Sequence, residues 1–166
     1  MPDSSNFPVG LKRAAAMVVL RCEDRFLLLR RKKPPYVGHY LPVGGKLEPF
    51  EDPRRAALRE LEEESGIVLE SLRFGGILTE TSPLDYNWQS YIYWAEIPYM
   101  PAPECPEGTL EWISFGLLGQ VPTPPTDMLV YQYLCMEKPF VFDAIYNASM
   151  ELVRMFEEIE GKTVWG

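Results

Sequence analysis

The densest group of chemically useful side chains lies near position 60, where glutamates occupy positions 60, 62, 63 and 64. On a helix, which turns about 100° per residue, Glu63 and Glu64 fall within about 60° of Glu60, whereas Glu62 points to nearly the opposite side. Like charges at these spacings destabilise a helix, so a purely structural helix has little reason to gather three of them. Carboxylates are ligands that Mg²⁺ and Mn²⁺ prefer, and these cations commonly bridge carboxylates to phosphate oxygens. The spacing therefore indicates a magnesium or manganese site, with a solvated acidic helix face as the alternative.

A helix must position these carboxylates, and its ends are visible in the sequence. Asp52 is a good N-cap, and Pro53 follows it at the first helical position, where a missing N–H costs nothing. Gly66 is a typical helix stop. The sequence thus predicts a helix over Pro53–Ser65 that carries the four glutamates.

The same stretch resembles the Nudix hydrolase signature, which is a Gly, five residues, a Glu, seven residues, and then Arg-Glu-aliphatic-any-Glu-Glu-any-Gly-aliphatic. The matching positions, without exception, are Gly45, Glu51, Arg59, Glu60, Leu61, Glu63, Glu64, Gly66 and Ile67. The resemblance implies a mixed β-sheet in an α/β/α sandwich. It also implies a loop–helix–loop that holds a metal ion against a diphosphate, so that metal-activated water attacks a phosphorus of a nucleoside diphosphate linked to another group.

The resemblance also assigns roles to single residues. It implies that Glu60, Glu63 and Glu64 bind the metal with help from the carbonyl of Gly45. By the same resemblance Arg59 orients a carboxylate, either that of Glu51 or that of one of the helix acids.

Two loop positions depart from the commonest form of the signature. Val43 separates a proline from the glycine pair, and Phe50 stands where glycine is frequent. Both leave every metal position intact.

Most of the remaining chain reads as strands. Apolar or alternating runs predict strands at 14–21, 25–31, 88–97, 110–115, 140–146 and 152–156, with a β-rich segment at 67–79. Repeated glycine and proline predict a loop over 32–45. A second helix is expected over 128–137, with Thr126 or Asp127 as its cap. This order predicts a mixed sheet between helices, an α/β or α+β layered fold.

Size and charge narrow the class of protein. The chain of 166 residues is 46% apolar, which suits one globular domain spanning residues 1–166. Its net charge of −8 argues against binding a nucleic-acid polymer, which needs a basic surface. No signal peptide or membrane span is recognisable, and the three cysteines have no metal-ligand spacing, so we expect a cytoplasmic protein. A monomer and a homodimer both remain open.

The second half of the chain resembles the MutT-like branch of the family, which hydrolyses 8-oxo-dGTP and related oxidised purine triphosphates. The resemblance implies that Asp127 reads the purine edge, although a plain helix N-cap is an equal alternative. It places Glu107 where the branch often has a further metal-binding or base-like glutamate, with an exposed loop acid as the alternative. The candidate catalytic residues are therefore Glu51, Arg59, Glu63 and Glu107.

A basic run leaves the second predicted strand toward the glutamates. It comprises Arg30, Arg31, Lys32 and Lys33, and one or two of these are expected to contact phosphate, with Arg30 and Lys32 as the candidates. Lys46 is a weaker candidate of the same kind. The expected substrate is thus a small nucleotide.

Two other functions fit the same residues. Pro83 resembles a marker of the ADP-ribose branch, and Tyr86 lies near a tyrosine of the dinucleoside polyphosphate branch. A Nudix domain that binds nucleotide without catalysis is a third possibility, which the complete set of signature carboxylates disfavours.

Overall fold

A single mixed sheet organises the protein, which is described here by a computed structural model covering residues 7–166. The first six residues of the N-terminal leader lie outside this range. The strands are β1 (Arg13–Cys22), β2 (Arg25–Arg31), β3 (Tyr40–Leu41), β4 (Val43–Lys46), β5 (Arg73–Thr81), β6 (Trp88–Glu96), β7 (Glu104–Cys105), β8 (Gly108–Ser114), β9 (Phe140–Tyr146), β10 (Leu152–Glu157) and β11 (Lys162–Trp165). The helices are α1 (Pro53–Ser65), the 3₁₀ helix η2 (Phe115–Gln120) and α2 (Pro125–Cys135).

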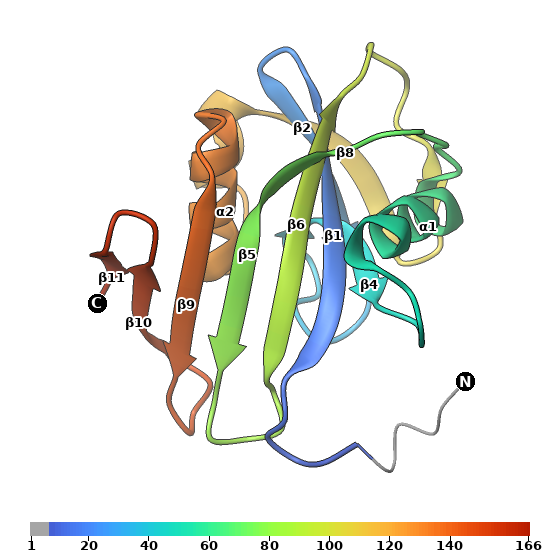
Figure 1. Cartoon of the computed structure of the whole chain (residues 1–166). Coiled ribbons are helices and arrows are strands. Elements are labelled where there is room, and N and C mark those ends of the chain that lie inside the picture. The colour runs from blue at the N-terminus through green and yellow to red at the C-terminus, as the bar shows by residue number, and fades with distance from the viewer. Residues whose placement is uncertain (1–6) are drawn as a thin grey trace.

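The sheet combines parallel and antiparallel pairs. Its strand order is β11-β10-β9-β5-β6-β1-β2-β8-β7, with β3 pairing β2 and β4 pairing β1. The pairs β1–β6 and β5–β9 are parallel, and the other pairs are antiparallel. Figure 1 shows β9, β5, β6 and β1 side by side, with α1 and α2 lying against the sheet.

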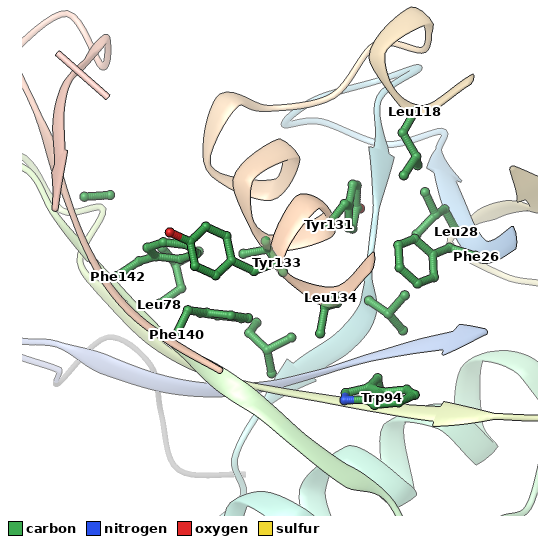
Figure 2. Packing of buried hydrophobic residues seen from close by; sticks show 14 of the residues in the cluster. Phe26, Leu28, Leu78, Trp94, Leu118, Tyr131, Tyr133, Leu134, Phe140 and Phe142 are labelled. Carbon is green, nitrogen blue, oxygen red and sulfur yellow. The ribbon is translucent and has the colours of Figure 1, made fainter. Parts of the chain in front are cut away.

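Each face of the sheet has its own apolar core. On β6, Ile92 and Trp94 belong to the cluster that packs with α2, and Tyr93 belongs to the cluster that packs with α1. This alternation matches the prediction for the strand at 88–97. Figure 2 shows the α2 side, where Tyr133 lies against Phe142. Helices on opposite faces of a mixed sheet confirm the predicted fold class.

Several predicted boundaries were wrong. The segment 32–45, expected to be loop, contains β3 and most of β4 because both pair with strands that precede it in the chain. The β-rich segment 67–79 becomes a strand only from Arg73. Helix α2 begins at Pro125 rather than Met128, and its N-cap is Pro124 with no side-chain capping hydrogen bond, so neither Thr126 nor Asp127 caps it.

The sheet divides at β1, and this division creates the space for a site. The C-terminal end of β1 pairs with β2, from Leu20 opposite Leu27 onward, whereas Ala15–Val18 pair with β4. Residues of β1, β2 and β4 all line one cavity of about 450 Å³. In the described range 7–166, no helix is long and apolar enough to cross a membrane.

Candidate active site

The helix with the glutamates is set in place by its two caps. The carboxylate of Asp52 accepts a hydrogen bond from the Arg55 backbone N–H at 2.9 Å, as expected of an N-cap. Gly66 ends the helix in the left-handed region at a φ of 75°, and its N–H donates to the carbonyl of Glu62. Ala56, Ala57 and Leu61 are buried against the sheet, which turns the side chains of Glu60 and Glu64 toward the cavity that they line.

Arg59 binds three of the signature carboxylates. Its Nε and Nη2 donate to the two carboxylate oxygens of Glu51, at 2.8 and 2.9 Å. Its Nη1 donates to Glu60 at 2.9 Å and to Glu63 at 3.2 Å. The bidentate hydrogen bond from Arg59 lowers the pKa of Glu51. Arg59 is therefore placed to orient Glu51 and two helix acids at once.

The glycine pair on β4 permits close approach of the backbone. A Cβ on Gly45 would lie 2.6 Å from Oε1 of Glu60, and a Cβ on Gly44 would collide with the carbonyl oxygen of Ala16. Only glycine fits at either position without a shift of the backbone or of the Glu60 carboxylate. The absence of these side chains brings the Gly45 backbone next to the carboxylate of Glu60.

Glu64 has a polar atom without a partner. Its Oε2 is buried and forms no hydrogen bond within the described residues. Burial, together with the negative charges of Glu60 and Glu107, raises the pKa of Glu64 to about 8. A buried carboxylate oxygen without a hydrogen-bond partner is a group that a divalent cation can satisfy, so the chemistry of this side chain fits the implied metal.

The other two acids implied as metal-site residues lie differently. The side chain of Glu63 is 58% exposed and does not line the cavity, whereas Glu107, in the turn between β7 and β8, does. Glu107 also pairs with Lys33 at 3.8 Å. As arranged here, the described residues contain no group of three His, Cys, Asp or Glu side chains close enough to hold a metal ion.

The strand alternation of β2 decides which basic residue reaches the cavity. Arg31 and Lys46 line it, whereas Arg30 and Lys32 do not. Arg31 also donates to the carbonyls of Lys33 and Pro34, at 2.9 and 3.2 Å, which ties its side chain to the loop after β2. The prediction of Arg30 and Lys32 as phosphate contacts is therefore not matched by the cavity lining, because the basic run alone does not reveal which residue faces inward.

Part of the cavity lining, called the inner end below, combines acidic and aromatic side chains. Asp127 lines it from the first turn of α2, and Glu80 lines it from β5. Burial raises the pKa of Asp127 well above its ordinary value, and the nearby charge of Glu80 raises it further. Tyr36, Tyr86 and Trp88 contribute aromatic surface.

Glu80 was not among the site residues predicted from the sequence. One signal was available, because Glu80 takes the inward position on a strand where Leu78 is buried two residues earlier. A charged residue at an inward strand position is uncommon without a functional or structural partner.

A glycine loop and a carboxylate-bearing helix facing a cavity beside a mixed sheet define a class of enzyme that performs metal-assisted phosphoryl chemistry. The family model described as the NUDIX domain matches residues 10–132. The chain therefore belongs to the Nudix hydrolase family, whose members hydrolyse pyrophosphate bonds and generally use a divalent metal, typically Mg²⁺. This confirms the family suggested by the signature.

The similar proteins carry different names, which range from an uncharacterised Nudix hydrolase to a diphosphoinositol polyphosphate phosphohydrolase and a MutT protein. The chain is 26% identical over 121 residues to an uncharacterised Nudix hydrolase, YvcI, of Bacillus subtilis, covering 70% of this chain and 75% of that protein. It is 31% identical over 86 residues to human diphosphoinositol polyphosphate phosphohydrolase 3-beta, covering 52% of this chain and about half (51%) of that relative. A solved MutT protein from Bacillus halodurans shares the fold, with a TM-score of 0.75 at 20% identity over 89% of this chain and 98% of that one.

Proposed function

We propose that the protein hydrolyses a nucleoside triphosphate, with an oxidised purine nucleotide such as 8-oxo-dGTP as the expected substrate, to the monophosphate and pyrophosphate. The observation that carries the proposal is the single cavity. It joins the carboxylates of Glu60 and Glu64 at one end to an acidic and aromatic inner end at Asp127. A nucleotide has the matching two parts, a polyphosphate and a flat base.

The charge of the cavity supports a nucleotide over a more highly phosphorylated ligand. Two basic side chains line it, Arg31 and Lys46, against five carboxyl groups, those of Glu60, Glu64, Glu80, Glu107 and Asp127. A diphosphoinositol polyphosphate carries phosphate over its whole surface, so the inner carboxyls would repel it. A neutral base at that end avoids the repulsion.

The residues around the phosphates have separable roles in this proposal. Glu60, Glu64, the exposed Glu63 and the carbonyl of Gly45 would hold Mg²⁺ or Mn²⁺. When bound, such a cation polarises phosphoryl oxygens and lowers the pKa of coordinated water. Arg59 keeps carboxylates in position through the hydrogen bonds it already makes.

Charge balance at the phosphates comes from the two basic residues of the cavity. Arg31 and Lys46 would neutralise phosphate charge that the metal leaves uncompensated. Glu107 lines the cavity near Glu64 and is the candidate for a further metal ligand or a base.

A product-resolved substrate panel tests the proposal. With Mg²⁺ present, 8-oxo-dGTP, the ordinary deoxynucleoside triphosphates, ADP-ribose, diadenosine tetraphosphate and a diphosphoinositol polyphosphate are compared by kcat/KM. We expect the highest value for a nucleoside triphosphate, with monophosphate and pyrophosphate as products. If ADP-ribose or diadenosine tetraphosphate is turned over best, the substrate is wrong, and binding without any product would indicate a silent nucleotide-binding domain.

A matched pair of variants tests the role of the helix. Glu64→Gln removes a carboxylate with an orphaned oxygen in the cavity, whereas Glu62→Gln changes an exposed glutamate of the same helix. We expect Glu64→Gln to lose at least about 100-fold in kcat, as is usual for a group that stabilises charge in the transition state. Glu62→Gln should stay near wild type. Equal activity of the two variants would contradict the metal-site assignment.

A further inference from the structure

Glu80 is a buried carboxyl that nothing in the hydrolytic machinery explains. It projects from the central strand β5 into the cavity and is only 6% exposed. In residues 7–166, no lysine or arginine forms a salt bridge with it. Burying a carboxyl without a cationic partner costs free energy, so a residue of this kind is expected to serve a purpose.

Two tyrosines hold this carboxyl in one orientation. The hydroxyl of Tyr146, at the end of β9, donates to Oε2 of Glu80 at 2.5 Å. The hydroxyl of Tyr86 lies 3.4 Å from both oxygens, and the two tyrosine rings meet edge to face with centroids 5.9 Å apart. These hydrogen bonds use only part of the acceptor capacity of the carboxyl, which leaves lone pairs free for a ligand.

Asp127 lines the same cavity as Glu80. The charge of Glu80 raises the pKa of Asp127, and burial raises the pKa of Glu80 as well. The pKa of Tyr36 is raised by burial and, further, by the negative charges of Glu80 and Asp127. Because the raised pKa of Asp127 favours its neutral form, Asp127 can keep a proton while Glu80 is ionised. Such a pair offers one hydrogen-bond donor together with several acceptors.

We propose that Glu80 is a specificity-determining residue that acts with Asp127 to bind the base of the substrate. The inner end of the cavity then selects a purine with the edge pattern of guanine. This inference rests on the proposed function, because it assumes that the substrate is a nucleotide whose phosphates lie at the Glu60 end.

The pattern of hydrogen bonds explains the choice of base. The pairing edge of guanine presents two adjacent donors, N1–H and the 2-amino group, beside the acceptor O6. A carboxylate can accept from both donors, and the protonated partner can donate to O6, which satisfies all three groups. Adenine offers only one amino donor beside one ring acceptor on that edge, so a carboxylate that accepts two hydrogen bonds from guanine accepts only one from adenine. The aromatic rings of Tyr36, Tyr86 and Trp88 supply the apolar walls.

Variants of Glu80 and Tyr146 test the inference through the ratio of kcat/KM for dGTP to that for dATP. The kcat/KM values for dGTP and dATP are measured for wild type, Glu80→Gln and Tyr146→Phe, with Mg²⁺ present. We expect Glu80→Gln to lower the dGTP value on the order of 10- to 100-fold, the range of a lost bidentate base contact, and to change the dATP value much less. Tyr146→Phe keeps its ring but loses its hydrogen bond to Glu80, and should shift the ratio in the same direction by a smaller factor.

Tyr133→Phe is the matched control. It removes a hydroxyl from another buried tyrosine, on α2, which packs against Phe140 and Phe142 and not on Glu80. The ratio of dGTP to dATP should be unchanged in this variant. A general loss of stability in Glu80→Gln would lower kcat/KM for dGTP and dATP by the same factor. Only a change in the ratio of the two kcat/KM values therefore supports recognition of the base by Glu80. An unchanged ratio in Glu80→Gln overturns the inference.

Binding without metal separates this inference from the proposed function. The affinities of dGMP and dAMP are measured by calorimetry in the presence of EDTA, for wild type and Glu80→Gln. We expect wild type to bind dGMP at least about tenfold more tightly than dAMP and Glu80→Gln to lose this preference. A preference for dGMP over dAMP without hydrolysis of any triphosphate would contradict the proposed function but not this inference. Hydrolysis with no preference that depends on Glu80 would sink the inference alone.

Discussion

At the scale of the single residue, Asp127 is a carboxyl whose ionisation is disfavoured by burial. Its pKa is raised above the ordinary value by burial and by the charge of Glu80. A carboxyl whose pKa is higher in the folded than in the unfolded state contributes stability below its unfolded pKa. That contribution is lost as the pH rises through the folded pKa.

Asp127→Asn should therefore be stabilising, and increasingly so as the pH rises. An amide keeps the shape and polarity of Asp127 but cannot ionise, so the variant avoids the penalty of a buried charge. We expect the Tm of Asp127→Asn minus that of wild type to grow between about pH 4 and about pH 8, the interval above the ordinary carboxyl pKa. Thermal melts at several pH values measure it. A difference that stays flat or shrinks with rising pH would show that Asp127 ionises freely in the fold.

Phe50 is a second residue whose backbone conformation costs free energy. It adopts a φ of 65° in the loop before α1, and its side chain is fully exposed. An L-residue in the left-handed region costs about 1–2 kcal/mol, whereas glycine adopts it freely. The exposed ring gains nothing from packing that would offset this cost.

Comparing Phe50→Gly with Phe50→Ala isolates the strain at this position. Both variants remove the ring, but only glycine removes the Cβ. We expect Phe50→Gly to be more stable than Phe50→Ala by roughly 0.5–1 kcal/mol, after allowing for the greater entropy of unfolded glycine. Urea denaturation of the two variants provides the measurement. Equal stability would mean that the loop relaxes to another backbone conformation once the ring is gone.

At the scale of the element, the bounds of α1 follow from local signals, whereas the other elements depend on pairing between segments that are distant in the sequence. The helix has the predicted bounds, Pro53–Ser65, because its N-cap, proline and terminal glycine act through neighbours in the chain. Strands β3 and β4 contain prolines and glycines that suggest loop, and they exist because β2 and β1 offer partners. Similarly, the orientation of Glu80 depends on a hydrogen bond from Tyr146, which lies 66 residues away in the sequence. The signature side chains were visible in the sequence, whereas the wall of the inner cavity was not.

The alternation of β2 gives a prediction that belongs to the strand as a whole. Arg31 lines the cavity and Arg30, its neighbour, points to the opposite face. We expect Arg31→Ala to reduce kcat/KM for the best triphosphate on the order of 10- to 100-fold, the worth of a charged hydrogen bond to phosphate. Arg30→Ala should remain within about twofold of wild type.

The structural role of Arg31 calls for a control. Because its guanidinium also donates to the carbonyls of Lys33 and Pro34, the substitution could loosen the loop after β2. Arg31→Lys keeps the charge but loses the fork, so it should recover part of the activity if phosphate charge is what matters. Activity of Arg31→Ala equal to that of Arg30→Ala would remove Arg31 from the phosphate site.

At the scale of the whole molecule, the orientation of Glu80 in the cavity depends on a strand that lies outside the matched family region. The NUDIX domain match ends at residue 132, and β9 follows it at Phe140–Tyr146. This strand pairs in parallel with β5 and lies between β5 and β10, as Figure 1 shows. The pairing places Tyr146 against Glu80. The residues that line the cavity thus lie within the matched region, whereas the hydrogen bond that orients Glu80 comes from sequence that follows it.

The packing of β9 should therefore control the stability of the entire domain rather than that of a peripheral hairpin. Phe142 is fully buried, stacks on Phe140 with ring centroids 4.7 Å apart and meets Tyr133 of α2 at 4.8 Å, as Figure 2 shows. Ile145 lies on the other face of the same strand and is 39% exposed. We expect Phe142→Ala to lower the free energy of unfolding by about 3–5 kcal/mol, and Ile145→Ala by less than about 1 kcal/mol. Urea denaturation followed by tryptophan fluorescence and by circular dichroism measures both losses. One shared transition is expected, because β9 is an interior strand of a continuous sheet. If Phe142→Ala produced two separated transitions, with α1 unfolding apart from β9, the two faces of the sheet would be independent units.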